Sequence, residues 1–167
     1  PIPVPVILVR PFFLKYLSLI KKIKGYQRIH KPVFVFVPTI DSSRTVFKFL
    51  SFFLPNGNYV SSKRKKRAQI IDAFRNGKYS YLVTTAVWER VVTVKNIQVI
   101  VFGADSSIYD SSALIQIAGR VGRKVGATDG DVIFLADKKA DSMVEAIANI
   151  KSSNSFLQSV LKRHESK

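Results

Sequence analysis

The chain has 167 residues, with 27 Lys and Arg against 11 Asp and Glu, so its formal net charge is +16. Apolar residues make up 47% of the chain, enough for a packed core, and this excludes an intrinsically disordered protein. The absence of cysteine excludes a disulfide scaffold and a thiolate metal site. The excess of positive charge indicates a polyanionic partner, either nucleic acid or an acidic membrane surface, with a basic but inert surface as the alternative.

The length fits a single domain. No apolar run reaches the roughly 20 residues of a transmembrane helix. The two histidines, His30 and His164, lack the spacing of metal ligands, so we expect no bound metal. The chain opens with Pro1 rather than methionine and shows no signal peptide, so we expect a piece of a longer protein.

Residues 1–11 are interrupted by prolines and are expected to be extended. Over residues 12–24, apolar side chains recur at helical spacing between lysines, and Gly25 is the expected end of a helix. We expect this basic amphipathic helix to pack on the domain's own sheet, on a partner domain or on a membrane surface. Residues 1–31 are therefore expected to lead into a domain that spans residues 32–167.

Short apolar segments and amphipathic helices then alternate along the chain. The predicted strands span residues 33–37, 58–60, 81–84, 99–102 and 132–135. The predicted helices begin with one capped by Asp41 or Ser42, and continue with residues 62–76, 111–118 and about 138–164, the last with a possible break at Ser152-Ser153-Asn154. Strands that are apolar throughout are covered on both faces, so the pattern predicts an α/β fold, a mostly parallel sheet between two layers of helices.

Ligands of open α/β folds bind at the carboxyl ends of the parallel strands. This topology directs the search for a site to residues 38–43, 61–63, 84–94, 103–111 and 119–124. The distinctive motifs of the chain lie within these segments or beside them.

The most distinctive segment runs from Gln116 to Arg123 and reads Gln-Ile-Ala-Gly-Arg-Val-Gly-Arg. Glycines allow a backbone to approach a bulky anion, and the guanidinium groups of Arg120 and Arg123 can each bind phosphate oxygens through two donors. Such a pair suits the charge that develops on a transferring γ-phosphoryl group. The plainer interpretation is a glycine-rich turn with two exposed arginines.

This string resembles motif VI of the superfamily-two helicases, and three further segments resemble other parts of the same proteins in the same order. Residues 84–93 resemble motif V, the strand that leads to Thr39 resembles motif IV, and residues 61–77 resemble the segment between them. Together the four cover about residues 32–136. The resemblance implies a RecA-like domain, related to the P-loop NTPases, that forms the second, C-terminal motor domain of a helicase.

The resemblance also implies roles for individual residues. Arg123 is the implied arginine finger, and Arg120 is an implied second contact to the γ-phosphate. The other implied nucleotide contacts are Gln116, Gly119, Gly122 and Thr93. The implied nucleic-acid contacts are Thr39, Ser62, Thr85 and Arg90, and the basic run described below adds Lys63 and Arg64 as candidates.

Two departures from the family pattern bear on activity. Val91 stands where motif V has glycine, and a β-branched side chain suits a positive φ poorly. The chain also has no Gly-x-x-x-x-Gly-Lys-Ser/Thr loop and no Asp-Glu pair after an apolar strand. We therefore expect it to complete an ATP site whose phosphate loop and Mg²⁺ belong to a first domain, and to hydrolyse no ATP alone.

A run of five cations, Lys63 to Arg67, stands at the start of the predicted helix over residues 62–76. Cations in a first helical turn oppose the helix dipole and repel one another, whereas a bound phosphate would reverse both effects. This favours a sequence-independent, salt-sensitive contact with a nucleic-acid backbone. The alternative is a solvated helix face.

Within the superfamily, motifs V and VI are most similar to those of the ComFA family, the ATP-driven motors of DNA uptake in competent bacteria. We therefore expect the C-terminal motor domain of a DNA helicase or translocase that acts in DNA uptake during competence. The expected partners are single-stranded or double-stranded DNA, the N-terminal RecA-like domain and membrane-associated DNA-uptake machinery, in the cytoplasm or at the inner face of the cell membrane. The alternatives are a replication-restart helicase domain of the PriA type and a non-enzymatic nucleic-acid-binding module of the same fold.

Overall fold

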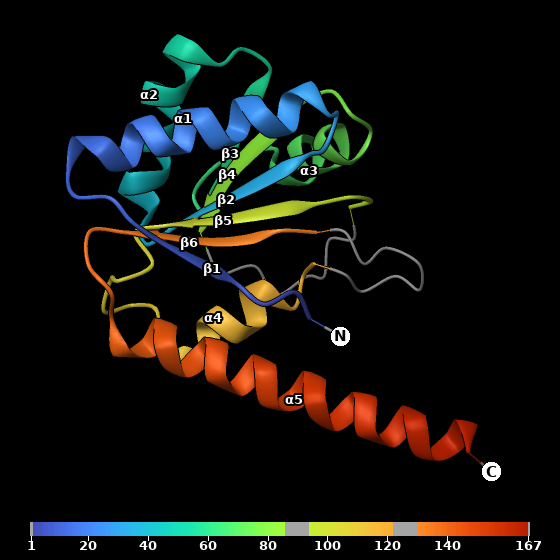
Figure 1. Cartoon of the computed structure of the whole chain (residues 1–167). Helices are drawn as coiled ribbons and strands as arrows, with labels where there is room; N and C mark the ends of the chain where they lie inside the picture. The colour runs from blue at the N-terminus through green and yellow to red at the C-terminus, as the bar shows by residue number, and fades with distance from the viewer. Residues whose placement is uncertain (1, 86–93, 122–129, 167) are drawn as a thin grey trace.

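The computed structural model describes residues 2–85, 94–121 and 130–166, which contain six strands and five helices (Figure 1). The strands are β1 (Val6–Val9), β2 (Val33–Val37), β3 (Gly57–Val60), β4 (Tyr81–Thr85), β5 (Gln98–Phe102) and β6 (Val132–Ala136). The helices are α1 (Phe13–Arg28), α2 (Ile40–Phe53), α3 (Arg67–Arg75), α4 (Ser111–Ala118) and α5 (Asp141–Glu165).

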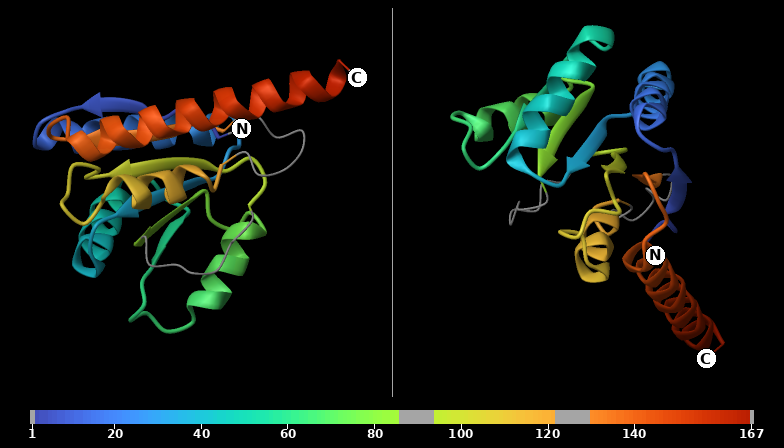
Figure 2. Two further views of the ribbon diagram at one scale, coloured as in Figure 1. Left: turned by 90° about the horizontal axis from the view of Figure 1, so that it is seen from below. Right: turned by 90° about the vertical axis from the view of Figure 1, so that its left-hand side faces the viewer.

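The six strands form one parallel sheet in the order β1-β6-β5-β2-β4-β3. Every residue of β2, β4, β5 and β6 is buried, because helices cover both faces of the sheet (Figure 2). Helices α1 and α2 pack on one face, and α3, α4 and α5 pack on the other. The predicted three-layer α/β fold with a mostly parallel sheet is confirmed.

The sheet has one strand more than the five predicted, because β1 joins it at one edge. Val6 of β1 pairs with Ile133 of β6, and the register continues to Val9 and Ala136. A strand that is only four residues long and follows three prolines has little sequence signal, and an edge is the place where a sheet tolerates nearby prolines.

Helix α1 packs on the domain's own sheet, which was one of the three alternatives for it. Leu19 and Ile23 are fully buried there. The predicted end at Gly25 is wrong, because the helix continues to Arg28. Tyr26, which follows Gly25 in the helix, lies against the sheet. Its hydroxyl donates a hydrogen bond to Asp131 Oδ2 at 3.0 Å.

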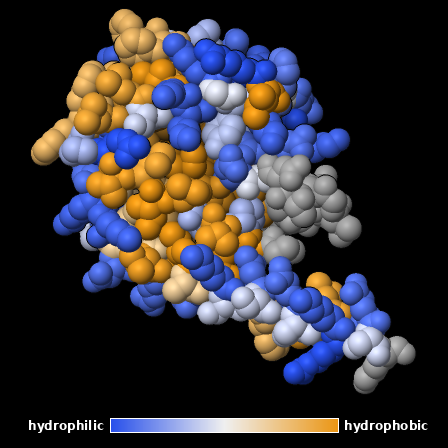
Figure 3. Space-filling model, in the orientation of Figure 1, coloured by the Kyte–Doolittle hydropathy of each residue, from blue (hydrophilic) through white to orange (hydrophobic). Residues whose placement is uncertain are grey.

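The outer surface where α1 begins and α2 ends is apolar, as the upper left of Figure 3 shows. Its exposed members are Phe12, Phe13, Leu14, Leu17, Phe52 and Phe53. An aromatic contact connects the two helices, since the ring centroids of Tyr16 on α1 and Phe49 on α2 lie 4.8 Å apart. Within α2, the ring centroids of Phe49 and Phe53 lie 5.3 Å apart. Among the described residues, no helix combines the length and the apolarity needed to cross a bilayer.

Helix α5 runs without interruption from Asp141 to Glu165, so the predicted break at residues 152–154 is wrong. The side chain of Asn154 forms its hydrogen bonds from within the helix, and the helix does not end there. Its Oδ1 accepts a hydrogen bond from the Ile2 amide at 3.0 Å, and its Nδ2 donates to the Ile2 carbonyl oxygen at 2.7 Å. These two bonds fasten the first described residue of the chain to the middle of its last helix.

Candidate nucleic-acid and nucleotide sites

Three of the predicted nucleic-acid contacts lie at the carboxyl ends of adjacent strands. Thr85, the last residue of β4, pairs with Val37 of β2, and Thr39 follows that strand end. Ser62 follows the end of β3, which is the neighbour of β4 on its other side. Thr39 and Ser62 are exposed, whereas Thr85 is only 3% exposed. Thr39 and Ser62 therefore form the exposed surface of this edge. Thr85 is buried on β4, which lies between the two strands that lead to them.

Thr39 is also the N-cap of α2. Its hydroxyl oxygen accepts a hydrogen bond from the Ser42 amide at 3.1 Å, and the Ser42 hydroxyl oxygen accepts one from the Thr39 amide at 3.1 Å. The predicted cap at Asp41 or Ser42 is therefore wrong, because the reciprocal capping box places Thr39 at the start and Ser42 in the first turn. The remaining free amides of this first turn lie at the same edge of the sheet.

The basic run that begins at Lys63 departs from its predicted structure. Helix α3 begins only at Arg67, and its N-cap is Lys66, which has a left-handed φ of 61° and makes no side-chain cap. The predicted start at residue 62 is therefore wrong. A helix there would place the other cations of the run in its first turns, where they would oppose the dipole and repel one another. Only Arg67 of the run stands in the first turn of α3.

Arg64 differs from its neighbours because its side chain folds back on β3. Its Nη1 donates to Asn58 Oδ1 at 2.6 Å and to the Tyr59 carbonyl oxygen at 2.7 Å, and its guanidinium lies 4.1 Å from the centre of the Tyr59 ring. The side chains of Lys63 and Lys65 are exposed. The loop therefore presents Lys63 and Lys65 to a polyanion, while Arg64 holds the loop against the edge of the sheet.

The segment predicted to face the nucleotide begins on the last turn of α4. Gln116 is exposed there, and Gly119 is the C-cap, with its amide donating to the Ile115 carbonyl oxygen at 2.9 Å. The φ of Gly119 is −66°, so its backbone conformation is one that any residue adopts. Arg120 follows and is half-buried.

The described part of this segment, which ends at Val121, does not lie at the carboxyl ends of the strands, where the search placed residues 119–124. Val121 packs against the residues that precede β5 and β6. A Cβ on Gly130 would lie 1.9 Å from Val121 Cγ1 and 3.1 Å from the Ile97 carbonyl oxygen. The described part of the segment is therefore at the amino-terminal edge, because α4 runs back along the sheet from the end of β5.

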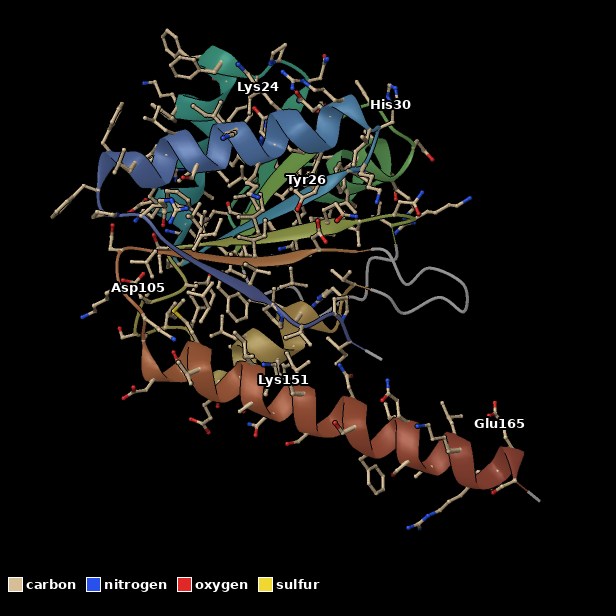
Figure 4. The ribbon with its side chains drawn as sticks, in the orientation of Figure 1. Lys24, Tyr26, His30, Asp105, Lys151 and Glu165 are labelled. Carbon is tan, nitrogen blue, oxygen red and sulfur yellow. The ribbon has the colours of Figure 1, made fainter. Side chains whose placement is uncertain are left out.

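The described members of the two predicted sites thus lie at opposite edges of the sheet. In Figure 4, Asp105 marks the carboxyl edge and His30 marks the amino-terminal edge. Thr39 and Ser62 belong to the first edge, and Arg120 belongs to the second.

The remaining predicted contacts lie outside the described residues, as does Val91. They are Arg90, Thr93, Gly122 and Arg123. Within the described ranges, no three His, Asp or Glu side chains gather in a way that could hold a metal ion.

Comparison with known families decides the class of the chain. Residues 14–125 match the family described as "Helicase conserved C-terminal domain". The chain belongs to this helicase family. The match begins inside α1, so the family's characteristic sequence includes part of the segment that precedes β2.

Two curated relatives are similar to this helicase domain over most of its length. Competence protein ComFA of Bacillus subtilis (strain 168) is 39% identical over 133 residues, which are 78% of this chain and 28% of the relative. Competence protein ComFA of Streptococcus pneumoniae (strain ATCC BAA-255 / R6) is 32% identical over 163 residues, which are 90% of this chain and 38% of the relative. The chain thus spans well under half of either relative.

The fold of the helicase domain is also that of solved helicase structures. Dbp5 of S. cerevisiae, solved with RNA and ADP BeF3, superposes with a TM-score of 0.72 at 18% identity, over 90% of this chain and 39% of that one. The predicted resemblance to a superfamily-two helicase C-terminal domain with a RecA-like fold is therefore confirmed.

Two features of the helicase domain's site were not predicted. One is the anchoring of Arg64 to Asn58 and Tyr59. The only signal for it in the sequence is that these residues lie close to Arg64 along the chain. The other is Tyr109, which lies in the loop before α4 and is 2% exposed, and whose hydroxyl has no hydrogen-bond partner among the described residues. Burial raises the pKa of Tyr109, so the hydroxyl stays protonated.

We expect Tyr109→Phe to stabilise the helicase domain by up to about 1 kcal/mol, because it removes a buried hydroxyl that bonds to none of the described residues. Urea denaturation followed by circular dichroism measures the change. Tyr26→Phe is the matched control and is expected to destabilise by about 1 kcal/mol, since it removes the bond to Asp131. A loss of stability in Tyr109→Phe would show that the hydroxyl has a partner in solution.

Proposed function

We propose that this domain is the second motor half of an ATP-dependent DNA helicase or translocase of the ComFA type, acting in DNA uptake during competence. The observation that carries the proposal is the 39% identity to a competence protein over 133 residues. The helicase family match over residues 14–125 supports the use of ATP and nucleic acid.

In this proposal, ATP lies between the amino-terminal edge of the sheet and a first motor domain that supplies the phosphate loop and holds Mg²⁺. Arg123 acts as the arginine finger and Arg120 as a second γ-phosphate contact. The further nucleotide contacts are Gln116, Gly119, Gly122 and Thr93. Two fixed guanidinium groups would stabilise the charge that spreads over the γ-phosphoryl oxygens as the bond to ADP breaks.

The carboxyl edge is the proposed nucleic-acid surface. Thr39 and Ser62 are exposed at the ends of β2 and β3, the two strands on either side of β4, and Lys63 and Lys65 extend that surface with positive charge. Contacts of this kind reach the phosphate backbone and are independent of sequence. Because the nucleotide edge is the opposite one, closure of the two motor domains on ATP would shift this surface along the strand.

The proposal is tested by measuring ATP hydrolysis by the full-length protein with and without single-stranded DNA. We expect hydrolysis that DNA stimulates, and none from the 167-residue domain alone. Binding of DNA by the full-length protein without any hydrolysis would favour the non-enzymatic module.

We expect Lys63→Ala with Lys65→Ala to weaken DNA binding by the full-length protein and to make it less sensitive to salt. Each phosphate contact contributes about 0.7 to the slope of log affinity against log salt for single strands, so the slope should fall by roughly 1.4. Fluorescence anisotropy of a labelled oligonucleotide over a salt series measures both quantities.

The matched control is Lys21→Ala with Lys22→Ala, which removes the same charge from α1 on the other face of the sheet. It should leave the slope nearly unchanged. Equal effects of the two double variants would mean that net charge, and not the loop after β3, determines binding.

A further inference from the structure

The carboxyl-terminal half of α5 extends beyond the body of the domain (Figure 2). The last fully buried residue of the helix is Ile150. From Ser155 to Ser166, every residue is exposed except Val160, which is half-buried. We call residues 155–166 the projecting segment, and in Figure 4 most of it lies between the labels of Lys151 and Glu165.

The projecting segment continues the same helical face that is buried earlier in α5. Met143, Ala146 and Ile150 pack against the sheet and α4. Leu157 and Leu161 follow Ile150 and Asn154 by two helical turns, and therefore lie on the same side of the helix. Leu157 is 47% exposed and Leu161 is 61% exposed, so an apolar stripe that begins in the core ends uncovered.

A partner would stabilise the projecting segment, because most of the stability of a helix in a protein comes from packing of its amphipathic face. Within the described residues, nothing covers the face that carries Leu157 and Leu161. Its last turn is basic, with Lys162, Arg163 and His164 beside one carboxylate, Glu165. A complementary surface is therefore apolar at its centre and acidic at its rim.

The structure also shows which polypeptide reaches this place. Asn154 holds both backbone groups of Ile2, one turn before Leu157. In the proposed motor a first domain precedes this one, and the polypeptide that joins the two would emerge beside the projecting segment. A second copy of the chain has no such tether and would have to find the stripe by diffusion.

We propose that the projecting segment is the docking surface for the polypeptide that precedes this domain, the first motor domain with its connecting segment. This inference rests on the proposed function, which requires such a domain. α5 then joins the two halves of the motor through Leu157 and Leu161, away from both the nucleotide edge and the nucleic-acid edge of the sheet.

Photo-cross-linking in the full-length protein tests this. Leu161→p-benzoylphenylalanine places the probe on the stripe, and mass spectrometry identifies the partner after irradiation. We expect cross-links within one molecule to residues that precede the domain. Cross-links to a second copy, to DNA, or to no partner at all would overturn the proposal.

The matched control is Val144→p-benzoylphenylalanine, at a residue that is 44% exposed on another side of the same helix. It should give no cross-link to the preceding residues. The readout does not depend on catalysis. A cross-link without DNA-stimulated ATP hydrolysis would uphold docking and refute the motor function, and hydrolysis without the cross-link would do the reverse.

Discussion

Arg123→Ala in the full-length protein is expected to lower DNA-stimulated ATP hydrolysis by about 10³-fold or more, the effect of losing an arginine finger. The physical reason is that the γ-phosphoryl group gains negative charge on its equatorial oxygens as it leaves ADP, and a fixed guanidinium is the group that stabilises it. Steady-state phosphate release at saturating ATP and DNA measures the effect.

Arg75→Ala is the matched control, because Arg75 is an exposed arginine of α3 whose one ion pair, with Asp72, spans 3.7 Å on the surface. It should leave the hydrolysis rate within about 2-fold of the parent, since exposed pairs contribute little. A rate in Arg123→Ala equal to that of Arg75→Ala would remove Arg123 from the catalytic assignment. The affinity for DNA should change little in either variant.

Ile23→Ala is expected to destabilise the domain by about 2–5 kcal/mol, the range for truncating a large buried side chain. Ile23 lies on the side of α1 that packs on the sheet, and both Ile23 and Leu19 are fully buried there. The residues before β2 were expected to lead into a domain that begins at residue 32. The prediction therefore tests whether α1 contributes to the same cooperative unit. Chemical denaturation of the 167-residue chain measures the change.

Leu17→Ala is the control for this substitution, since Leu17 lies on the same helix and is 45% exposed. It is expected to cost no more than about 0.5–1 kcal/mol, in proportion to the smaller area that it buries. If Ile23→Ala were as mild as Leu17→Ala, α1 would be an appendage that is not required for folding.

The central strands and most of the helices follow from local sequence patterns. Segments such as Val33–Val37 are apolar throughout, and burial on both faces of a parallel sheet is the simplest arrangement for them. The strand β1 does not follow in this way. It is four residues long, and the residues that pair with it come more than a hundred positions later in β6. Its place in the sheet depends on that distant partner.

The errors at α3 and α5 concern places where residue types indicated one boundary and the structure has another. A periodic pattern indicated a helix from residue 62, but the helix begins at Arg67, so only one of the five cations stands in its first turn. Polar residues indicated a break near Asn154, but the helix is continuous and this side chain bonds to Ile2 from within it. A residue-by-residue propensity contains neither the charge of neighbouring residues nor a contact with the distant Ile2.

The motifs of the site could be found from sequence, whereas their arrangement could not. The order of Thr39, Ser62 and Thr85 along the chain does not reveal that their strands are neighbours, and this depends on the sheet order β2-β4-β3. The segment after α4 was grouped with the carboxyl edge, but the direction of that helix carries it to the other edge. Both facts are properties of topology.

The attachment of Ile2 to Asn154 also has a mechanical meaning. In a motor, tension from a preceding domain would enter through this residue and continue into β1. Because β1 lies parallel to β6 over its whole length, a pull along the strand loads all of their hydrogen bonds together in shear. Shear resists separation better than peeling, in which the bonds break one after another. The two hydrogen bonds at Asn154 would take up part of that load before it reaches β1, so α5 would act as the first anchor of the pulling chain.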